Sequence, residues 1–564
     1  MTRPAARHSA NAVHGPTCTE SAGAPPIPRG RAVRASFTDS RTMRSPAPGL
    51  PGRRFCAAAL AVALTIPAAL DAQQRRAPTV RTHEGLVSGI AGSRPGVHAY
   101  LGVPYGEPPV GDLRWRAPRT VARWKGVRAA DRFSPSCIQG PNTPFGPWTS
   151  EFLLLGPVSE DCLYLNVWTS ARPGEHRPVL VYLYGGGFSS GSGDVPVYDG
   201  GPLAEKGLVV VNMNYRVGAL GFLAHPELTK ESGASGNYGL LDQVAALRWV
   251  HDNIAAFGGD PRRVMLAGQS AGAISVFLHT VSPMSKGLFQ RAAIESGPGG
   301  LAAFGLGSTR AAARPLADAE KDGVAFAERL GAHTLAELRA LPATKFIGVG
   351  RFGPVVDGRF LTAPPPDIVA GGRQNDVPTI TGLNADEGSA SPGYGKPTAD
   401  AYHKQVKQRF GDRAAKVLAA YPATTDDEAH RAAIESGRDA GVAGLERMLA
   451  ERARTARTPA FAYYFDRAIP WPEHPEFGAF HTGEVPYVFG TLDALKRPWT
   501  DVDRTLSETM MSYWVNFAAT GNPNGASVPR WPAFDPAHPV VLRIGERIEP
   551  RAPLAAERAE LFAP

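Results

Sequence analysis

The sequence predicts an α/β fold in which a large, mostly parallel central sheet is flanked by helices. Short apolar segments rich in β-forming residues alternate with longer amphipathic stretches such as residues 240–256. One stretch, 263–278, also joins an apolar run to a second one through a tight turn bounded by glycines. The strands predicted for the sheet are 163–168, 179–184, 208–213, 264–267, 377–383, 460–465 and 540–544.

The chain opens with a segment that has the features of an export leader. Residues 1–52 are rich in Pro, Arg, Ser and Ala and have no apolar period; a basic pair, 53–54, then precedes an apolar core at 55–70. The small-residue site that follows is typical of signal-peptide cleavage, and the core is shorter than the roughly 20 residues of a membrane span. We predict a leader with a signal peptide over 1–72 and export to the periplasm or outside the cell. A separate hypothesis is that synthesis starts at Met43 and not at residue 1. An uncleaved anchor is the alternative.

The charge of the chain is concentrated in this leader. The net charge is +8, and residues 1–72 hold nine Arg but only three acidic residues. The remaining chain, with 51 basic and 49 acidic residues, is nearly neutral. We therefore expect no nucleic-acid partner and no stable membrane span in the mature chain.

Two of the four cysteines, Cys137 and Cys162, lie beyond the leader. An exported protein can oxidise such a pair, and we predict a disulfide that closes a loop of about 25 residues and is worth about 3 kcal/mol. Two free buried thiols are the alternative. Neither cysteine has neighbours that suggest a metal site.

The mature chain reads as one domain over residues 73–564. Residues 79–89 and 98–105 alternate like an opening antiparallel hairpin. Two charged helical segments without strands, 310–341 and 399–448, follow the 263–278 stretch. We expect them to be insertions over the active site.

The strand–turn–helix pattern of 263–278 identifies a candidate nucleophile. Gly268-Gln269-Ser270-Ala271-Gly272 separates an apolar strand from a helix, which is the arrangement of a nucleophile elbow. Glycines on both sides of Ser270 leave room for the sharp turn. A second G-x-S-x-G match contains Ser189, but loop residues rather than a helix follow it. We therefore predict that Ser270 is the nucleophile.

A glycine run is the candidate oxyanion hole. The segment YGGGF at 184–188 ends the strand predicted at 179–184. Backbone N–H groups in such a run, together with that of the residue after the nucleophile, bind the substrate oxygen in hydrolases of this kind. We assign Gly186, Gly187 and Ala271 to this role. A glycine-rich turn without chemistry is the alternative.

A base and an acid are expected after the serine in chain order. Of the later histidines, His481 follows the strand at 460–465 by a loop and is favoured over His474, which lies between prolines and acids. The acid is expected after the strand at 377–383, where catalytic groups gather in parallel sheets. Asp386 and Glu387 both lie there, and the residues alone do not choose between them.

These motifs together resemble the type-B carboxylesterases, the cholinesterase-like α/β-hydrolases, over about residues 78–534. The resemblance is carried by GVPYGEPPVGDLRW (102–115), EDCLYLNVW (160–168), YGGGF (184–188), NYRVGALGFL (214–223), GNYGLLDQVAALRWVHDNIAAFGGDP (236–261), GLNADEG (382–388), HTGEVPYVFG (481–490) and WVNFAATGNPN (514–524).

The resemblance implies a role for each matching position. It implies Ser270 as nucleophile, Glu387 rather than Asp386 as acid and His481 as base. The oxyanion donors fall on Gly186, Gly187 and Ala271, and the family's N-terminal disulfide falls on Cys137 and Cys162. Ser296 matches a serine that hydrogen-bonds the triad acid.

The chain departs from this pattern in three places. Gln269 stands where glutamate is commoner, which removes a charge beside the nucleophile. No cysteine follows Cys162, so a further disulfide of the animal enzymes is absent. The spacing of Trp148 does not match the choline-binding tryptophan, and we expect no choline-ester specificity.

The function that these residues predict is hydrolysis of a small-molecule carboxylic ester through an acyl-enzyme, with neither metal nor cofactor. Because a triad fixes the reaction and not the substrate, an amidase, a lipase or a carbamate hydrolase is an alternative. A catalytically silent binding module is the alternative from another class.

Overall fold

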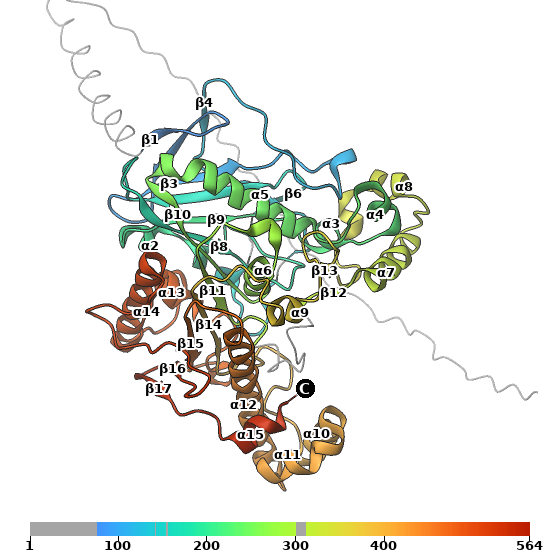
Figure 1. The fold of residues 1–564 in the computed structure, drawn as a ribbon, viewed down its shortest axis with the longest axis vertical. Coiled ribbons are helices and arrows are strands. Elements are labelled where there is room, and N and C mark those ends of the chain that lie inside the picture. The colour runs from blue at the N-terminus through green and yellow to red at the C-terminus, as the bar shows by residue number, and fades with distance from the viewer. Residues whose placement is uncertain (1–75, 142, 154–155, 300–311, 564) are drawn as a thin grey trace, which may run out of the picture. The chain divides into compact units, whose positions relative to one another are not determined.

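The computed structural model describes residues 76–141, 143–153, 156–299 and 312–563 (Figure 1). Thirteen strands of this part of the chain form one sheet in the order β1-β2-β3-β7-β9-β8-β10-β11-β14-β15-β16-β17, with β4 beside β2. Every pair from β9 to β16 is parallel, whereas the pairs at both ends of this path are antiparallel. The predicted α/β fold is confirmed, and the predicted leader lies outside the described residues.

The strands of the large sheet are β1 Arg76–Arg81, β2 Leu86–Ala91, β3 His98–Pro104, β4 Val127–Ala129, β7 Tyr164–Thr169, β8 Arg177–Leu183, β9 Val209–Met213, β10 Gly259–Gln269, β11 Arg291–Glu295, β14 Thr379–Asn384, β15 Ala460–Phe465, β16 Val541–Ile544 and β17 Ile548–Arg551. Two short pairs lie outside it: β5 Ser136–Cys137 with β6 Val158–Ser159, and β12 Arg314–Pro315 with β13 Val355–Val356.

The structure differs from the predicted strands in several places, including the short strands β4, β5, β6 and β13, which were not predicted. The opening hairpin is a three-stranded meander, because the chain turns at Thr82, whose N–H and hydroxyl both bond the Gly85 carbonyl at 2.9 Å. Strand β11 was not predicted, since its apolar run is only three residues long, and β17 was not predicted either. The segment 310–341, expected to lack strands, contains the two-residue strand β12.

The helices are α2 Gly201–Glu205, α3 Gly218–Phe222, α4 Pro226–Ser232, α5 Tyr238–Asn253, α6 Ala271–Thr280, α7 Leu316–Arg329, α8 Leu335–Ala340, α9 Pro365–Ala370, α10 Ala399–Phe410, α11 Ala414–Ala420, α12 Asp426–Ala453, α13 Val485–Phe489, α14 Asp501–Thr520 and α15 Ala556–Leu561. Parallel neighbours in the sheet need crossover connections, which these helices supply.

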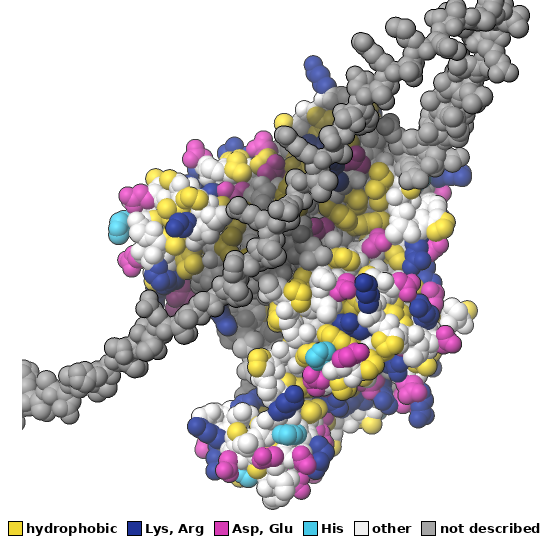
Figure 2. All heavy atoms as spheres, turned by 180° about the vertical axis from the view of Figure 1, so that it is seen from behind, with side chains coloured by type: hydrophobic (Ala, Val, Ile, Leu, Met, Phe, Trp, Pro, Cys, Tyr) yellow, Lys and Arg dark blue, Asp and Glu magenta, His cyan; other side chains and the backbone are white. Residues whose placement is uncertain are grey.

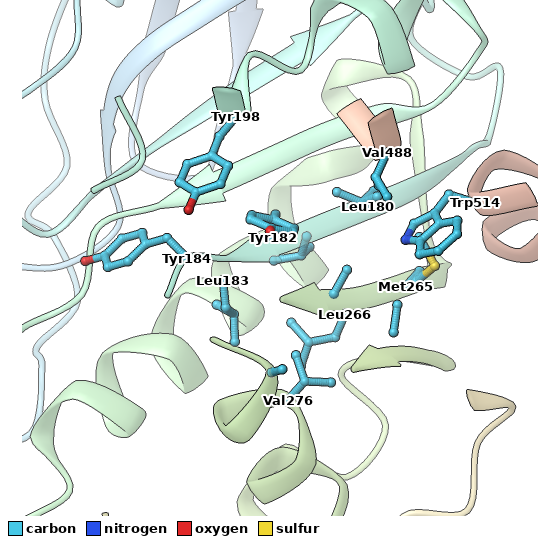
Figure 3. Packing of buried hydrophobic residues seen from close by; sticks show 14 of the residues in the cluster. Leu180, Tyr182, Leu183, Tyr184, Tyr198, Met265, Leu266, Val276, Val488 and Trp514 are labelled. Carbon is cyan, nitrogen blue, oxygen red and sulfur yellow. The ribbon is translucent and has the colours of Figure 1, made fainter. Parts of the chain in front are cut away.

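The sheet is covered on both faces where β8 and β10 cross its centre. Figure 3 shows Val276 of α6 on one side of these strands and Val488 of α13 and Trp514 of α14 on the other. Helix α5 lies beside α6, and Gln243 donates to the Ser275 hydroxyl at 3.3 Å. Because both faces are buried, the central strands are nearly continuous apolar runs, as in β9, where all five residues are buried.

The two helical segments occupy different places. Helices α7 and α8 pack with α3 and α4 in a core of their own that contains Leu220 and Phe326. Helices α10 and α11 form another core with the start of α12 and with α15, at the end of Figure 1 opposite β1 and β4. Helix α12 then runs back along β14 and β15.

The structure contains the Cys137–Cys162 disulfide, which joins β5 to the residue pair that precedes β7. The closed loop contains Trp148, which contacts His481.

No helix in the described ranges is long and apolar enough to span a bilayer. On the face shown in Figure 2, acidic and basic side chains are interspersed over the described residues rather than gathered by sign.

Candidate active site

Ser270 lies at the turn between β10 and α6, near the middle of the sheet. Its backbone has φ 59° and ψ −124°, a conformation that a residue with a side chain rarely adopts. Two backbone hydrogen bonds hold it there, from its N–H to the Glu295 carbonyl at 3.0 Å and from the Ile274 N–H to its own carbonyl at 2.9 Å. The sequence prediction of a strained strand-to-helix turn at Ser270 is therefore matched by the backbone.

The glycines of the motif are required by the approach of β8. At Gly272 an added Cβ would collide with the Leu183 carbonyl and lie 2.7 Å from its carbon. At Gly268 it would lie 2.7 Å from the Leu183 oxygen. Both distances are far inside van der Waals contact, so the turn packs against the neighbouring strand only when neither residue carries a side chain.

The glycine run after β8 lies beside the serine. A Cβ on Gly185 would be 2.9 Å from the Ser270 Cβ. Gly186 and Gly187 are exposed and have φ values of 107° and 61°, and a Cβ on Gly186 would lie 2.7 Å from the Ser190 carbonyl carbon. Positive φ and the crowded backbone both favour glycine at Gly186.

Three backbone donors are available around this point. Ala271 is the first residue of α6, so its N–H has no partner within the helix. In the described parts of the chain, no acceptor is paired with the N–H groups of Gly186, Gly187 or Ala271. The other matching serine, Ser189, is exposed in a turn and bonds the Gly186 carbonyl at 3.1 Å.

His481, which precedes α13, and Glu387, which follows β14, form a buried pair. Nδ1 of His481 hydrogen-bonds Glu387 Oε2, and the two residues are 7% and 2% exposed. The second carboxylate oxygen accepts the N–H of Asn384, the last residue of β14, at 2.8 Å. Burial opposes protonation of the imidazole, but the charge and hydrogen bond of Glu387 and the charge of Glu484 outweigh it and raise the pKa of His481.

Gln269, the residue before the serine, contacts the imidazole. The Gln269 amide nitrogen lies 3.3 Å from His481 Nε2 and 3.4 Å from Nδ1.

Asp386 and Glu387, which the sequence pattern left open, face different partners. Asp386 Oδ1 accepts Arg438 Nη2 at 2.7 Å and the Tyr394 hydroxyl at 3.2 Å, and its Oδ2 accepts the Ala479 N–H at 3.0 Å. These contacts anchor the loop to α12 and to the chain before His481. Glu387 alone of the two contacts the imidazole.

The rejected histidine lies away from this cluster. His474 is exposed, and its Nδ1 lies 3.3 Å from Glu476 Oε1. Its neighbours are thus consistent with a surface role.

One expectation taken from the family resemblance is corrected. Ser296 does not contact Glu387; its hydroxyl donates to Glu484 Oε1 at 3.4 Å. Ser296 directly follows β11, and the carboxylate that its hydroxyl reaches there is that of Glu484.

Glu484 and Glu295 are acidic residues of the site that the sequence analysis missed. Both side chains are fully buried. Burial and repulsion from Glu387 raise the pKa of Glu484 to about 7, although the Asn384 hydrogen bond opposes this. Burial and the charge of Glu484 raise the pKa of Glu295 well above its usual range. The spacing of Glu484, three residues after His481 at the start of α13, was the available signal.

Trp148, a residue of the loop closed by the Cys137–Cys162 disulfide, contacts His481. Its ring meets that of His481 edge-on, with centroids 6.3 Å apart and planes at 90°. The indole N–H donates to the hydroxyl of Thr482 at 2.8 Å. The disulfide loop therefore packs against the histidine and the residue that follows it.

No group of three or more His, Cys, Asp or Glu side chains in the described ranges is placed to hold a metal ion. A cavity of about 850 Å³ adjoins the glycine run and is lined by Gly187 and Phe188 on one side and by residues 346–354 on the other.

A parallel sheet with a strained serine at the end of a central strand, a buried histidine–carboxylate pair and exposed glycine amides is the arrangement found in hydrolases of the α/β type. Residues 76–561 match the Carboxylesterase family. The chain belongs to this family and is a carboxylic ester hydrolase.

Two curated relatives cover most of the chain. Over 479 residues, which are 80% of this chain and 84% of the relative, it is 38% identical to the fumonisin B1 esterase of Sphingopyxis macrogoltabida. Over 499 residues, 81% of each chain, it is 34% identical to the cholinesterase of Mus musculus.

Proposed function

We propose that Ser270, His481 and Glu387 are the catalytic triad of this esterase. The observation that carries the proposal is the buried His481–Glu387 pair beside a serine held in a nucleophile elbow. Glu387 fixes the tautomer of the imidazole by accepting its Nδ1 proton, which leaves Nε2 as the base. Asn384 supports the orientation of Glu387 by donating to its other oxygen.

The reaction follows from these positions. Ser270 Oγ attacks the ester carbonyl carbon while His481 Nε2 takes its proton, and the tetrahedral oxyanion accepts the N–H groups of Gly186, Gly187 and Ala271. His481 then protonates the leaving alcohol. The same imidazole activates water, which cleaves the acyl-enzyme and restores Ser270. Each oxyanion donor lowers the barrier by roughly 3 kcal/mol.

The test compares three variants on a p-nitrophenyl ester. Ser270→Ala and His481→Ala are each expected to lower kcat by several orders of magnitude while the circular dichroism spectrum is retained. His474→Ala is the matched control and should retain wild-type kcat. A phosphonate probe should label the wild type and not Ser270→Ala. Wild-type rates in Ser270→Ala would refute the assignment, and failure of the wild type to be labelled would favour a silent binding module.

The substrate is proposed to be a small-molecule carboxylic ester. The names of the two relatives refer to different esters, so neither is transferred to this chain. Amides, long-chain lipids and carbamates use the same chemistry, and a panel that adds these to p-nitrophenyl esters of increasing acyl length separates the classes. The highest kcat/KM on an amide or carbamate would replace ester hydrolysis as the principal activity.

We further propose that residues 73–564 form one catalytic domain that is exported after removal of the leader 1–72. The basic pair at 53–54, the apolar core at 55–70 and the Cys137–Cys162 disulfide support export. N-terminal sequencing of the protein from periplasm and medium tests this. A cytoplasmic protein that still begins at residue 1 or at Met43 would contradict it.

A further inference from the structure

The 850 Å³ cavity is the feature of the site that the triad does not explain. It reaches the candidate oxyanion hole at Gly187 and helix α6 at Ile274, one turn after Ser270. Its size is in the upper range of small-molecule pockets. Acetyl or another very small group would fill only a minor part of it.

The cavity lies on the acyl side of the proposed reaction. A leaving alcohol must face His481, because that residue protonates it. His481 and its neighbours Trp148 and Thr482 do not line the cavity, whereas the glycine that would bind the carbonyl oxygen does. The group that extends from the carbonyl away from the base therefore enters this space.

The lining of the cavity combines an apolar body with positive charge. Its apolar side chains include Ile138, Phe188, Leu220, Ile274, Phe346 and Phe352. Among the described residues of the lining, the charged ones are Arg314 and Arg351, and none is a carboxylate. A guanidinium offers paired donors that match a carboxylate, which an apolar chain end cannot use.

The two arginines differ in what already binds them. Arg314 Nη2 pairs with Asp322 Oδ2 at 2.6 Å, but both side chains are exposed, at 44% and 60%, so the pair is weak. The backbone of Arg314 is fixed by its N–H bond to the Pro354 carbonyl at 3.0 Å. Arg351 is exposed on the loop before Pro354, and within the described residues its side chain has no ion pair or hydrogen bond.

We propose that this cavity selects bulky acyl groups that carry a carboxylate at the far end, with Arg351 as the principal partner of that carboxylate and Arg314 as the second. The proposal rests on the proposed function, since it requires the acyl-enzyme to form at Ser270. The apolar lining holds the body of the acyl chain, and the arginines bind its anionic end.

The test measures a ratio of kcat/KM values for two p-nitrophenyl esters with six-carbon acyl groups, the mono-adipate and the hexanoate. The wild type should favour the adipate. Arg351→Ala should lower the adipate-to-hexanoate ratio about tenfold, which corresponds to about 1.4 kcal/mol, mainly through KM for the adipate. Arg314→Ala should lower it less, and added salt should lower it in the wild type.

Lys345→Ala is the matched control. Lys345 is also an exposed cation, at the 3₁₀ turn Ala343–Phe346 next to the loop, but it does not line the cavity. Its ratio should equal that of the wild type.

A wild-type ratio at or below one, or an unchanged ratio in Arg351→Ala, would overturn the proposal. An equal fall in the ratio in Lys345→Ala would also overturn it, because general surface charge would then explain the preference. The proposed triad is tested separately, since Ser270→Ala must lose both esters whatever the ratio is. Hydrolysis of both by Ser270→Ala would overturn the triad and, with it, this assignment.

Discussion

The side-chain amide of Asn384 donates to Glu484 Oε2 at 2.5 Å and to the Phe480 carbonyl at 2.7 Å. Its backbone N–H meanwhile holds Glu387. One residue at the end of β14 therefore ties the loop of the acid to the chain on both sides of His481. The geometry of the proposed triad depends on this connection as much as on its own members.

Asn384→Ala should lower kcat about tenfold or more while KM changes little. The backbone bond to Glu387 remains, but the segment from Phe480 to Glu484 loses its amide donors, and a buried acceptor without a partner costs about 1–3 kcal/mol. Steady-state kinetics and urea unfolding measure the two effects. Ser296→Ala, which removes only a 3.4 Å contact to Glu484, is the control and should have smaller effects. Unchanged kcat with lowered stability would make Asn384 purely structural.

Glu484→Gln should move the acidic limb of the kcat/KM profile to lower pH, by less than about one unit because Glu484, with a pKa of about 7, is only partly ionised there. His481 acts as a base only when neutral, so the rate rises with pH through its raised pKa. The charge of Glu484 helps to raise the pKa of His481, so loss of that charge lowers this pKa. Glutamine keeps an oxygen acceptor for Asn384. A limb that stays in place would show that Glu484 has no electrostatic effect on the base.

Gln269→Glu should have the opposite effect and move the acidic limb upward by about one pH unit. The new carboxylate would lie where the amide now approaches His481 at 3.3 Å, and its charge favours the protonated imidazole. Gln408→Glu, which adds the same charge at an exposed position of α10, is the control. Equal shifts in both variants would indicate a general charge effect instead of a local one.

Gly272→Ala should abolish activity and lower the yield of folded protein, because the new Cβ collides with the carbonyl group of Leu183. Gly437→Ala makes the same substitution within α12, where a Cβ meets no atom within 4 Å. We expect it to retain activity and to gain up to about 1 kcal/mol of stability. Thermal unfolding and esterase assays on both proteins measure the contrast. Activity in Gly272→Ala near the wild-type value would mean that the turn can relax away from β8.

The sequence predicts an element correctly where a local pattern of apolar residues and glycines is enough to specify it. Strand β15 occupies the predicted residues 460–465, and the strained turn lies at Ser270. Strand β11 was missed because three apolar residues between charged ends do not reach the length of a recognisable buried run. Its burial comes from the neighbouring strands, which a local pattern does not contain.

The arrangement of the acids could not be predicted from spacing alone. Asp386 and Glu387 are consecutive, and only the positions of Arg438 and His481, each far along the chain, give them different partners. The same holds for Ser296, whose expected acceptor was Glu387. Its actual acceptor depends on how α13 packs against the end of β11, which is a tertiary relationship.

The ion pair between Arg438 and Asp386 has a further consequence for how this enzyme responds to its surroundings. Its oxygen and nitrogen are 2.7 Å apart, and the arginine side chain is 41% exposed whereas the carboxylate is only 9% exposed. Dissolved salt weakens attraction between exposed charges. Because the carboxylate of this pair is buried, salt screens it much less than an exposed pair, so the anchor of the residue next to Glu387 should persist as ionic strength rises.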